Sequence, residues 1–249
     1  MSKIIAVYGS PGSGKSTFSL SLATQLALRK QNVVLLSTDR VVPMLKVFVP
    51  SVPVDRSLSV GGLFLGTGIT QEDVCSRILF HPKCNCLGFM GLATGDTPNT
   101  YSGIYTADKM QSLYSILLGL TDTLIVDCMA NPSPAYDPLG SVAIANAALL
   151  VKTLTPDIQG LEYNKAILPL VSDSISGIRQ FTLLGKNSPT RPEKEFAAAA
   201  GETIEYTLSE SAEIADFFVS GHLMVGAKTK EGKAYLDTVK SIALEAIKE

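Results

Sequence analysis

Short apolar runs alternate with longer amphipathic segments along most of this chain. The runs are rich in β-branched residues and lie at positions 4–8, 33–36, 86–90, 123–126, 147–151 and 178–184. Most are apolar at every position, which is typical of strands buried on both faces. The pattern therefore predicts a mostly parallel sheet with helices on both sides.

Helical spacing marks the segments between these runs, at positions 17–30, 107–120, 158–170, 210–219 and 232–249. In the first segment, Phe18, Leu22 and Leu26 recur four residues apart and form one apolar stripe. The alternation of strands and helices predicts a doubly wound α/β layer with its ligand at the carboxyl ends of the strands. We expect residues 1–249 to form a single domain.

Two further segments, 41–68 and 232–249, differ from the strand and helix pattern or lie at its end. Residues 41–68 are rich in Pro, Val and Gly without a clear period, so we expect a long excursion beside the ligand site. The final segment carries one apolar stripe and a polar face of mixed charge, and it has no Trp or Phe to anchor it in a membrane. This favours docking against the sheet. The stripe consists of Leu236, Val239, Ala243 and Ile247.

Composition narrows the class of protein. The chain has 249 residues, of which 46% are hydrophobic, and its 21 basic and 23 acidic residues give a net charge of -2. These charges are spread along the sequence, so no basic block indicates strong electrostatic binding to nucleic acid or to an anionic membrane. The four cysteines are unevenly placed and no leader pattern precedes the first strand, which predicts a cytoplasmic protein with reduced thiols. The longest apolar stretch, 142–151, is too short to cross a bilayer.

Residues 9–16 read Gly-Ser-Pro-Gly-Ser-Gly-Lys-Ser, a complete G-x-x-x-x-G-K-[ST] phosphate-binding loop. It follows the first apolar run and precedes the first helical segment, which is the context this motif requires. Glycines let backbone N–H groups turn toward phosphate oxygens, Lys15 brings a positive charge to the β- and γ-phosphates, and Ser16 offers its hydroxyl to Mg²⁺. The loop predicts binding of a nucleoside triphosphate.

Two aspartates follow strand candidates at the edge where this loop must open. Asp127 ends the run Leu-Ile-Val-Asp and is expected to hold Mg²⁺ through a bound water. Asp39 comes after the second run and is suited to positioning the attacking water near the γ-phosphate. Either could instead be a helix cap or a turn residue.

These segments, in this order, resemble the ParA/MinD family of ATPases and the related arsenical-pump and tail-anchored-protein ATPases. The sequence Ser37-Thr38-Asp39 is especially similar to the corresponding segment of the latter two groups. The resemblance extends over nearly the whole chain, through the turn Thr155-Pro156-Asp157 and the region 204–221. It implies a P-loop NTPase fold and an Mg²⁺-ATP-dependent homodimer that opens on hydrolysis. It also implies a protein partner for localisation or activation.

One position departs from that family. Its members usually carry a signature lysine directly after the first glycine of the loop, and this chain has Ser10 there. A missing cation beside the transferred phosphoryl group implies slow turnover, or a constitutively dimeric scaffold that keeps ATP as a structural ligand. In this departure the chain is similar to the CpaE/TadZ-like proteins, atypical members that localise pilus and secretion machinery. The family resemblance also implies plasmid or chromosome partition as another role.

The family commonly reads the base with an Asn after its sixth strand, and Asn187 is the candidate here, with a surface turn as the alternative. No guanine signature Asn-Lys-x-Asp occurs, so we expect adenine. The residues expected to contact nucleotide are Gly9, Ser10, Pro11, Gly12, Ser13, Gly14, Lys15, Ser16, Thr17 and Asn187.

Two other functions fit parts of the sequence. Related metallocentre-maturation ATPases carry a C-x-C pair, and Cys84 and Cys86 have that spacing, with only His81 nearby to add a ligand. Cysteines entering a core strand more often serve as small hydrophobic residues. A small-molecule kinase would also use the phosphate loop, although no Arg-rich lid segment is evident.

Overall fold

The computed structural model describes residues 2–187 and 193–248. Its strands are β1 (Lys3–Gly9), β2 (Val33–Ser37), β3 (Leu79–His81), β4 (Cys84–Met90), β5 (Thr123–Asp127), β6 (Leu149–Leu154), β7 (Gln180–Asn187) and β8 (Tyr206–Ser209). Its helices are α1 (Lys15–Ala27), α2 (Leu45–Phe48), α3 (Gln71–Cys75), α4 (Ala107–Leu120), α5 (Pro138–Ala145), α6 (Ile158–Ile175), α7 (Glu193–Ala200), α8 (Ala212–Ser220) and α9 (Lys230–Ile247), with 3₁₀ turns η1 (Arg56–Leu58) and η2 (Val60–Phe64).

The described strands form one sheet in the order β3-β4-β2-β5-β1-β6-β7-β8. Every neighbouring pair is parallel except β3 and β4, which pair antiparallel at one edge. The order reverses direction beside β1, as expected when crossover helices are laid on both faces. The predicted doubly wound, mostly parallel α/β fold is confirmed.

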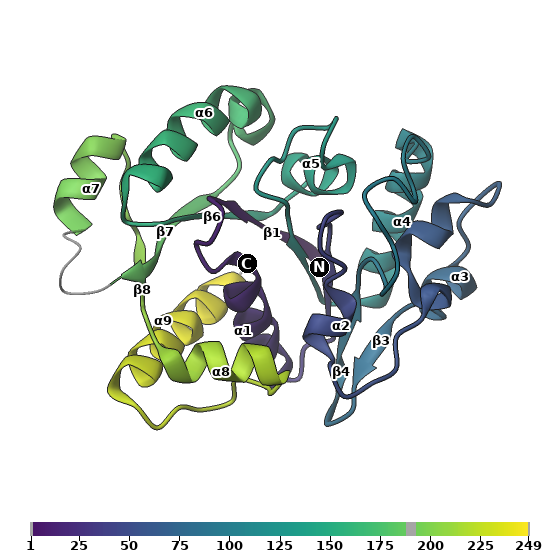
Figure 1. The fold of residues 1–249 in the computed structure, drawn as a ribbon, viewed down its shortest axis with the longest axis horizontal. Helices are drawn as coiled ribbons and strands as arrows, with labels where there is room; N and C mark the ends of the chain where they lie inside the picture. Colours follow the sequence, from purple (N-terminus) through teal and green to yellow (C-terminus); the bar gives the residue numbers. More distant parts are fainter. Residues whose placement is uncertain (1, 188–192, 249) are drawn as a thin grey trace.

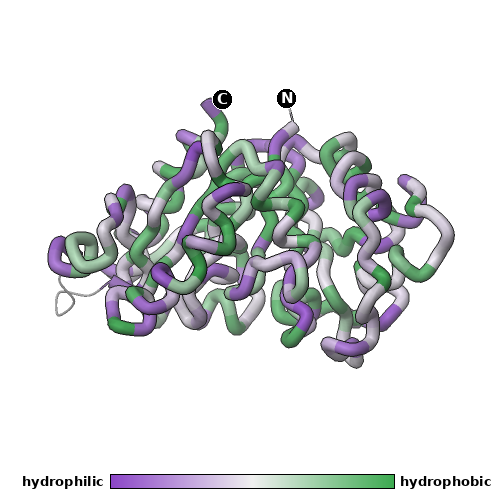
Figure 2. Tube along the Cα trace, turned by 90° about the horizontal axis from the view of Figure 1, so that it is seen from above, coloured by the Kyte–Doolittle hydropathy of each residue, from purple (hydrophilic) through white to green (hydrophobic). Residues whose placement is uncertain are grey.

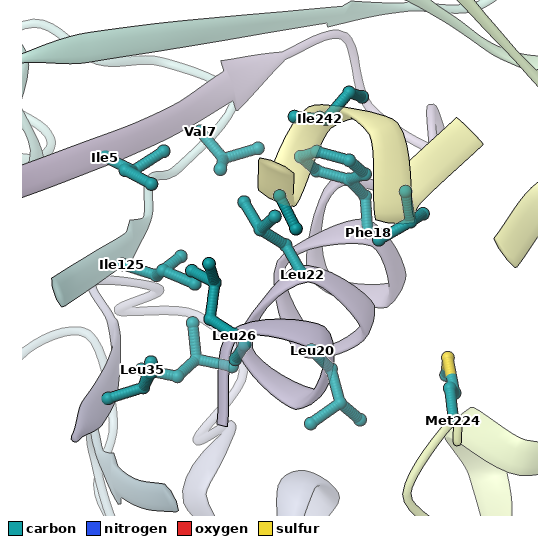
Figure 3. Close-up of a cluster of buried hydrophobic side chains, with 14 of the residues drawn as sticks. Ile5, Val7, Phe18, Leu20, Leu22, Leu26, Leu35, Ile125, Met224 and Ile242 are labelled. Carbon is teal, nitrogen blue, oxygen red and sulfur yellow. The ribbon is translucent and has the colours of Figure 1, made fainter. Parts of the chain in front are cut away.

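Helices cover the sheet on both sides (Figure 1). On one side, α1, α8 and α9 pack around a core that includes Phe18, Leu22 and Ile242, seen in Figure 3. On the other side, α4, α5 and α6 enclose a second core around Leu113 and Ile144. Figure 2 shows hydrophobic residues concentrated in the central strands and polar ones toward the outside. The all-apolar strands therefore have the double burial that their sequences predict.

The last helix docks as predicted. Leu236, Val239 and Ala243 are buried, and α9 contacts α1 and β8. Ile247 packs more loosely at the edge of the same core, and Glu249 lies outside the described residues. None of the helices in the described ranges has the length and apolar character to cross a membrane.

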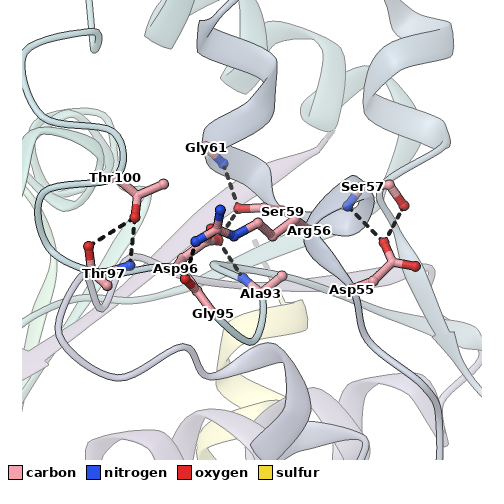
Figure 4. A network of polar contacts seen from close by, with 10 residues as sticks. All are labelled: Asp55, Arg56, Ser57, Ser59, Gly61, Ala93, Gly95, Asp96, Thr97 and Thr100. Carbon is pink, nitrogen blue, oxygen red and sulfur yellow. Dashed lines mark hydrogen bonds and ion pairs between the residues drawn. The ribbon is translucent and has the colours of Figure 1, made fainter.

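The excursion between β2 and β3 is folded rather than open, and it is fastened to the loop after β4 by a buried carboxylate (Figure 4). Asp96 accepts hydrogen bonds from the Ser59 hydroxyl at 2.6 Å and from Ala93 N–H at 2.9 Å. Arg56 lies 3.5 Å from the other oxygen of Asp96 and donates to the Gly95 carbonyl. These contacts hold two long loops together on the β4 side of the sheet.

Candidate nucleotide-binding site

Four parallel strands end together at one edge of the sheet. The register pairs Asp127 of β5 with both Val7 of β1 and Ser37 of β2, and pairs Gly9 with Thr153 of β6. The phosphate-binding loop and the two acidic strand ends therefore emerge side by side. This is the position expected for a ligand in an open α/β sheet.

The loop is fixed by close backbone contacts. A Cβ atom at Gly9 would lie 1.9 Å from the Thr153 carbonyl oxygen, so only glycine allows this approach. The Ser13 hydroxyl donates to the Ser10 carbonyl at 2.7 Å and lies 2.8 Å from the Thr153 hydroxyl. Helix α1 then begins at Lys15 without a side-chain cap, which leaves its first N–H groups directed at the loop. Such an arrangement suits phosphate.

Lys15 lies within this loop among acidic neighbours. Its ammonium nitrogen is 3.4 Å from the Ser10 carbonyl oxygen, to which it donates. Burial lowers the pKa of Lys15, and the nearby Asp127 and Asp39 carboxylates act in the opposite direction. The structure thus brings the lysine close to both predicted aspartates.

Asp127 and Ser16 meet directly. The Ser16 hydroxyl donates to Asp127 Oδ2 at 2.6 Å, and the Ser19 hydroxyl donates to Oδ1 at 3.3 Å. Burial raises the pKa of Asp127 to about 6, although both hydroxyls and the charge of Lys15 favour the ionised form. A carboxylate and a hydroxyl are oxygen donors of the kind that Mg²⁺ prefers. The residues present therefore fit a magnesium ion.

Asp39 has a turn contact of its own. Its Oδ1 accepts hydrogen bonds from the N–H groups of Val41 (2.8 Å) and Val42 (3.0 Å). This is an Asx-type turn, and it leaves the other carboxylate oxygen available on a half-buried side chain.

Ser10 is turned into the protein and is completely buried. Its hydroxyl accepts a hydrogen bond from Thr155 N–H at 3.1 Å, and the Thr155 hydroxyl in turn donates to Asp157 at 2.7 Å. Asp157 caps α6 by accepting from Gly160 N–H at 2.9 Å. The side chain at position 10 thus ties the phosphate loop to the beginning of α6.

Two connected hollows lie beside the loop. One, of about 460 Å³, is bordered by α1, the end of β7, the end of β8 and Tyr235 of α9. The other, of about 360 Å³, is bordered by the loop and by Phe218 and Val219 of α8. Both are lined by Gly14, Thr17 and Lys186, so together they lead from the phosphate loop to an apolar pocket. Their size suits a nucleotide base and sugar.

Asn187 ends β7 next to this pocket but is not among the residues that line it, whereas Gly185 and Lys186 are. Its backbone oxygen accepts from Glu210 N–H at 3.0 Å, and its side-chain oxygen is buried without a partner among the described residues. Sequence reasoning missed the β8–α8 turn as a pocket wall. No motif marks this turn; only the order of the strands identifies it.

A third carboxylate near the site was also missed. Asp137 is fully buried, and its Oδ2 accepts from the Thr38 hydroxyl at 2.7 Å and from Met129 N–H at 2.9 Å. Its Oδ1 accepts from Gly140 N–H at 2.8 Å, which caps α5. The sequence signal for the cap was an Asp followed by Pro at the first helical position.

Cys84 and Cys86 lie within β4 rather than before it, and both are half-buried against the core on the α1 side. Nδ1 of His81 accepts a hydrogen bond from Lys83 N–H at 3.1 Å. Within residues 2–187 and 193–248, no group of three His, Cys, Asp or Glu side chains is arranged to hold a metal ion.

Solved structures match the chain over nearly its full length. The septum site-determining protein MinD of Pyrococcus horikoshii, complexed with Mg-ADP, is 18% identical with a TM-score of 0.76, and the match covers 100% of this chain and 97% of that one. A ParA family ATPase of Chlorobium tepidum is 15% identical with a TM-score of 0.79, covering 98% of each chain. A plasmid partition protein of Borrelia burgdorferi bound to AMPPNP is 16% identical with a TM-score of 0.74, covering 99% and 100%. No protein-family model and no curated protein matches the sequence. At these identities, the matches show a shared P-loop NTPase fold.

Proposed function

We propose that this chain binds Mg²⁺-ATP at the loop of residues 9–16 and hydrolyses it slowly. The observation that carries the proposal is the meeting of Ser16 with Asp127 beside the half-buried Lys15, at the mouth of a pocket large enough for a nucleotide. Lys15 and the first N–H groups of α1 bind the phosphates, and Ser16 and Asp127 hold Mg²⁺, with Asp127 acting through water. When bound, the ion neutralises charge that develops on the phosphate oxygens.

Hydrolysis in this proposal depends on Asp39, which positions the attacking water with the carboxylate oxygen that its turn does not use. Adenine occupies the apolar pocket, and Asn187 is the candidate for reading its edge. Turnover is slow because position 10 carries a buried hydroxyl where a cation would help to stabilise the transition state.

The cellular role that we propose is a dimerising switch in intracellular positioning or partition. The solved structures that share this fold include a septum site-determining protein and a plasmid partition protein, which supports this class of role. Localisation of pilus or secretion machinery, as in the CpaE/TadZ-like branch, remains our preferred form of it because of Ser10. ATP then closes two copies face to face, and a protein partner sets the rate of opening.

A constitutively dimeric scaffold with bound ATP is the second candidate, and the inward direction of Ser10 favours it. The metallocentre interpretation is less well supported, because Cys84 and Cys86 pack against the core. The kinase interpretation is less well supported because no Arg-rich lid segment is evident in the sequence.

Calorimetry with Mg²⁺-ATP tests the proposal directly. We expect binding to the wild-type protein, weaker binding of GTP, and loss of the signal in Lys15→Ala. Lys46→Ala is the matched control, because that lysine donates to the carbonyls of Pro50 and Val52, within a few residues of its own position in the sequence. Light scattering with ATP, ADP and no nucleotide then separates the switch, whose mass changes, from the scaffold, whose mass does not. Equal heats from the wild-type protein and Lys15→Ala would contradict nucleotide binding at this loop.

A further inference from the structure

Asp39 is flanked on both sides by residues that bond to the loop between β5 and α5. The residue before it, Thr38, donates its hydroxyl proton to Asp137 at 2.7 Å. The residue after it, Arg40, donates from its guanidinium group to the carbonyl oxygen of Tyr136 at 3.4 Å. Tyr136 and Asp137, which are consecutive in the loop after β5, are thus bonded to Arg40 and Thr38, the two neighbours of Asp39 in the loop after β2. We refer to these two contacts as the Asp39 bridges.

The bridge through Thr38 is buried, and it uses both the backbone N–H and the side-chain hydroxyl of Thr38. Thr38 N–H also donates to the carbonyl oxygen of Asp127 at 3.0 Å, so Thr38 lies between the end of β5 and the carboxylate of Asp137. Asp137 in turn accepts from Met129 N–H, two residues beyond Asp127. Any displacement of the chain after Asp127 must therefore move Thr38, or break the buried hydrogen bond between Thr38 and Asp137.

The position of the Asp137 carboxylate is itself fixed. A Cβ atom at residue 140 would lie 1.9 Å from Asp137 Oδ2, so the carboxylate occupies space that only Gly140 leaves open. With both oxygens engaged by N–H groups of the β5–α5 segment, Asp137 moves with α5. The Thr38 hydroxyl is its contact with the segment that carries Asp39.

The second bridge extends the connection to a third loop. The guanidinium group of Arg40 also donates to the Pro98 carbonyl at 3.2 Å and lies 5.4 Å from the centre of the Tyr105 ring. Pro98 and Tyr105 belong to the loop after β4, which the Asp96 contacts hold in place. Arg40 thus joins the loops after β2, β4 and β5.

We propose that Thr38 and Arg40 are positioning residues. Through their contacts with Asp137 and Tyr136, a movement of the chain after Asp127 changes the position of Asp39. This inference rests on the proposed function, because it assigns a role in hydrolysis of the nucleotide bound beside Asp127. The bridges set where Asp39 stands relative to the phosphates and contribute nothing to nucleotide affinity. A misplacement of about 1 Å in such a group can lower a rate by roughly 100-fold.

The test compares Thr38→Val, which removes the hydroxyl at nearly constant shape, with Thr38→Ser, which keeps it. In single-turnover hydrolysis of ATP, we expect Thr38→Val to be about 10- to 100-fold slower than wild type, and Thr38→Ser to stay within about threefold. The dissociation constant for ATP is expected to stay within about twofold in both variants. Arg40→Ala is expected to slow hydrolysis in the same way without weakening binding.

A second measurement does not depend on the rate. In hydrogen exchange, ATP is expected to protect the amides of residues 12–16 in wild type and in Thr38→Val, and those of residues 38–42 in wild type only. A rate in Thr38→Val within twofold of wild type, or equal protection of residues 38–42 in both proteins, would overturn the coupling. Parallel losses of affinity and rate in Thr38→Val and Thr38→Ser would also overturn it, by giving Thr38 a merely structural role. Absence of protection at residues 12–16 in wild type would instead refute nucleotide binding.

Discussion

The Ser16 hydroxyl donates a 2.6 Å hydrogen bond to Asp127, a residue 111 positions later in the sequence. The contact joins the first turn of α1 to the end of β5, and it places the two oxygen donors expected at a magnesium ion within reach of one another.

Substitution of these two residues should remove the magnesium-dependent part of ATP affinity. We expect Ser16→Ala and Asp127→Asn each to weaken binding of Mg²⁺-ATP by at least about tenfold, and to leave binding in EDTA little changed. Calorimetry with and without EDTA measures both quantities. Ser19→Ala is the control and should leave the magnesium-dependent affinity little changed. The Ser19 hydroxyl also donates to Asp127, at 3.3 Å, but Ser19 is fully buried. Equal losses in EDTA would indicate a folding defect rather than a metal site.

Ser10 offers a test of the departure at the phosphate loop. Ser10→Ala leaves the buried Thr155 N–H without its acceptor and should lower the free energy of unfolding by about 1 to 3 kcal/mol. Ser10→Lys should destabilise the fold further, because a charged side chain does not fit a fully buried position. Chemical denaturation measures both. An increase in ATP turnover in Ser10→Lys would contradict this expectation, because it would show that a longer side chain leaves the pocket and reaches phosphate.

The stability of the protein should depend on pH through its buried carboxylates. Burial raises the pKa of Asp137 to about 6 from a usual value of 3.8. Since the folded state then holds a proton that the unfolded state has released, this contribution to stability is greatest below pH 4 and is lost as pH rises toward 6. The shift corresponds to roughly 3 kcal/mol. The difference in unfolding free energy between wild type and Asp137→Asn should therefore shrink as pH rises through this window.

Glu213 provides a control of opposite sign for that measurement. Hydrogen bonds from the hydroxyl and N–H of Thr229 and from Lys228 N–H lower the pKa of Glu213. Its contribution is present above the pKa of the unfolded chain and is lost as pH falls. The difference between wild type and Glu213→Gln should grow with rising pH, and the same trend in both variants would argue against these assignments.

The sequence was sufficient for the features whose signal is local. The phosphate loop is contiguous, the all-apolar strands follow from short runs rich in β-branched residues, and the stripe of α9 follows from helical periodicity. Asp137 was missed because its partners, Thr38 and Met129, come from separate segments that meet only in the folded sheet. The start of the strand within the apolar stretch 142–151 could not be located from the sequence, because the stretch is apolar across two elements. It runs from the end of α5 into β6, and the expected start at residue 147 is two residues before the strand begins.

Strand β3 was also missed. It is three residues long and pairs antiparallel at the edge of the sheet, so it carries too little periodicity to be recognised. The pocket wall at the β8–α8 turn depends on strand order, which hydrophobic patterns do not encode.

A buried ion pair on the α6 side of the sheet gives a prediction that does not involve the nucleotide. The ammonium group of Lys152 lies 2.6 Å from Glu202 Oε1 and 3.1 Å from Asn164 Oδ1, and its side chain is only 3% exposed. Lys152→Met would leave the carboxylate of Glu202, itself 16% exposed, facing the interior without its partner charge. Loss of one partner of a buried pair typically costs about 3 to 5 kcal/mol.

We therefore expect Lys152→Met to lower the free energy of unfolding by about 3 kcal/mol, and the double variant Lys152→Met/Glu202→Leu to recover part of that loss, since it buries no lone charge. Lys240→Met is the matched control. Its partner Asp237 is 70% exposed, so the change should stay within about 1 kcal/mol. The single variant Glu202→Leu completes the double-mutant cycle. Additive effects of Lys152→Met and Glu202→Leu would mean that Lys152 and Glu202 do not interact.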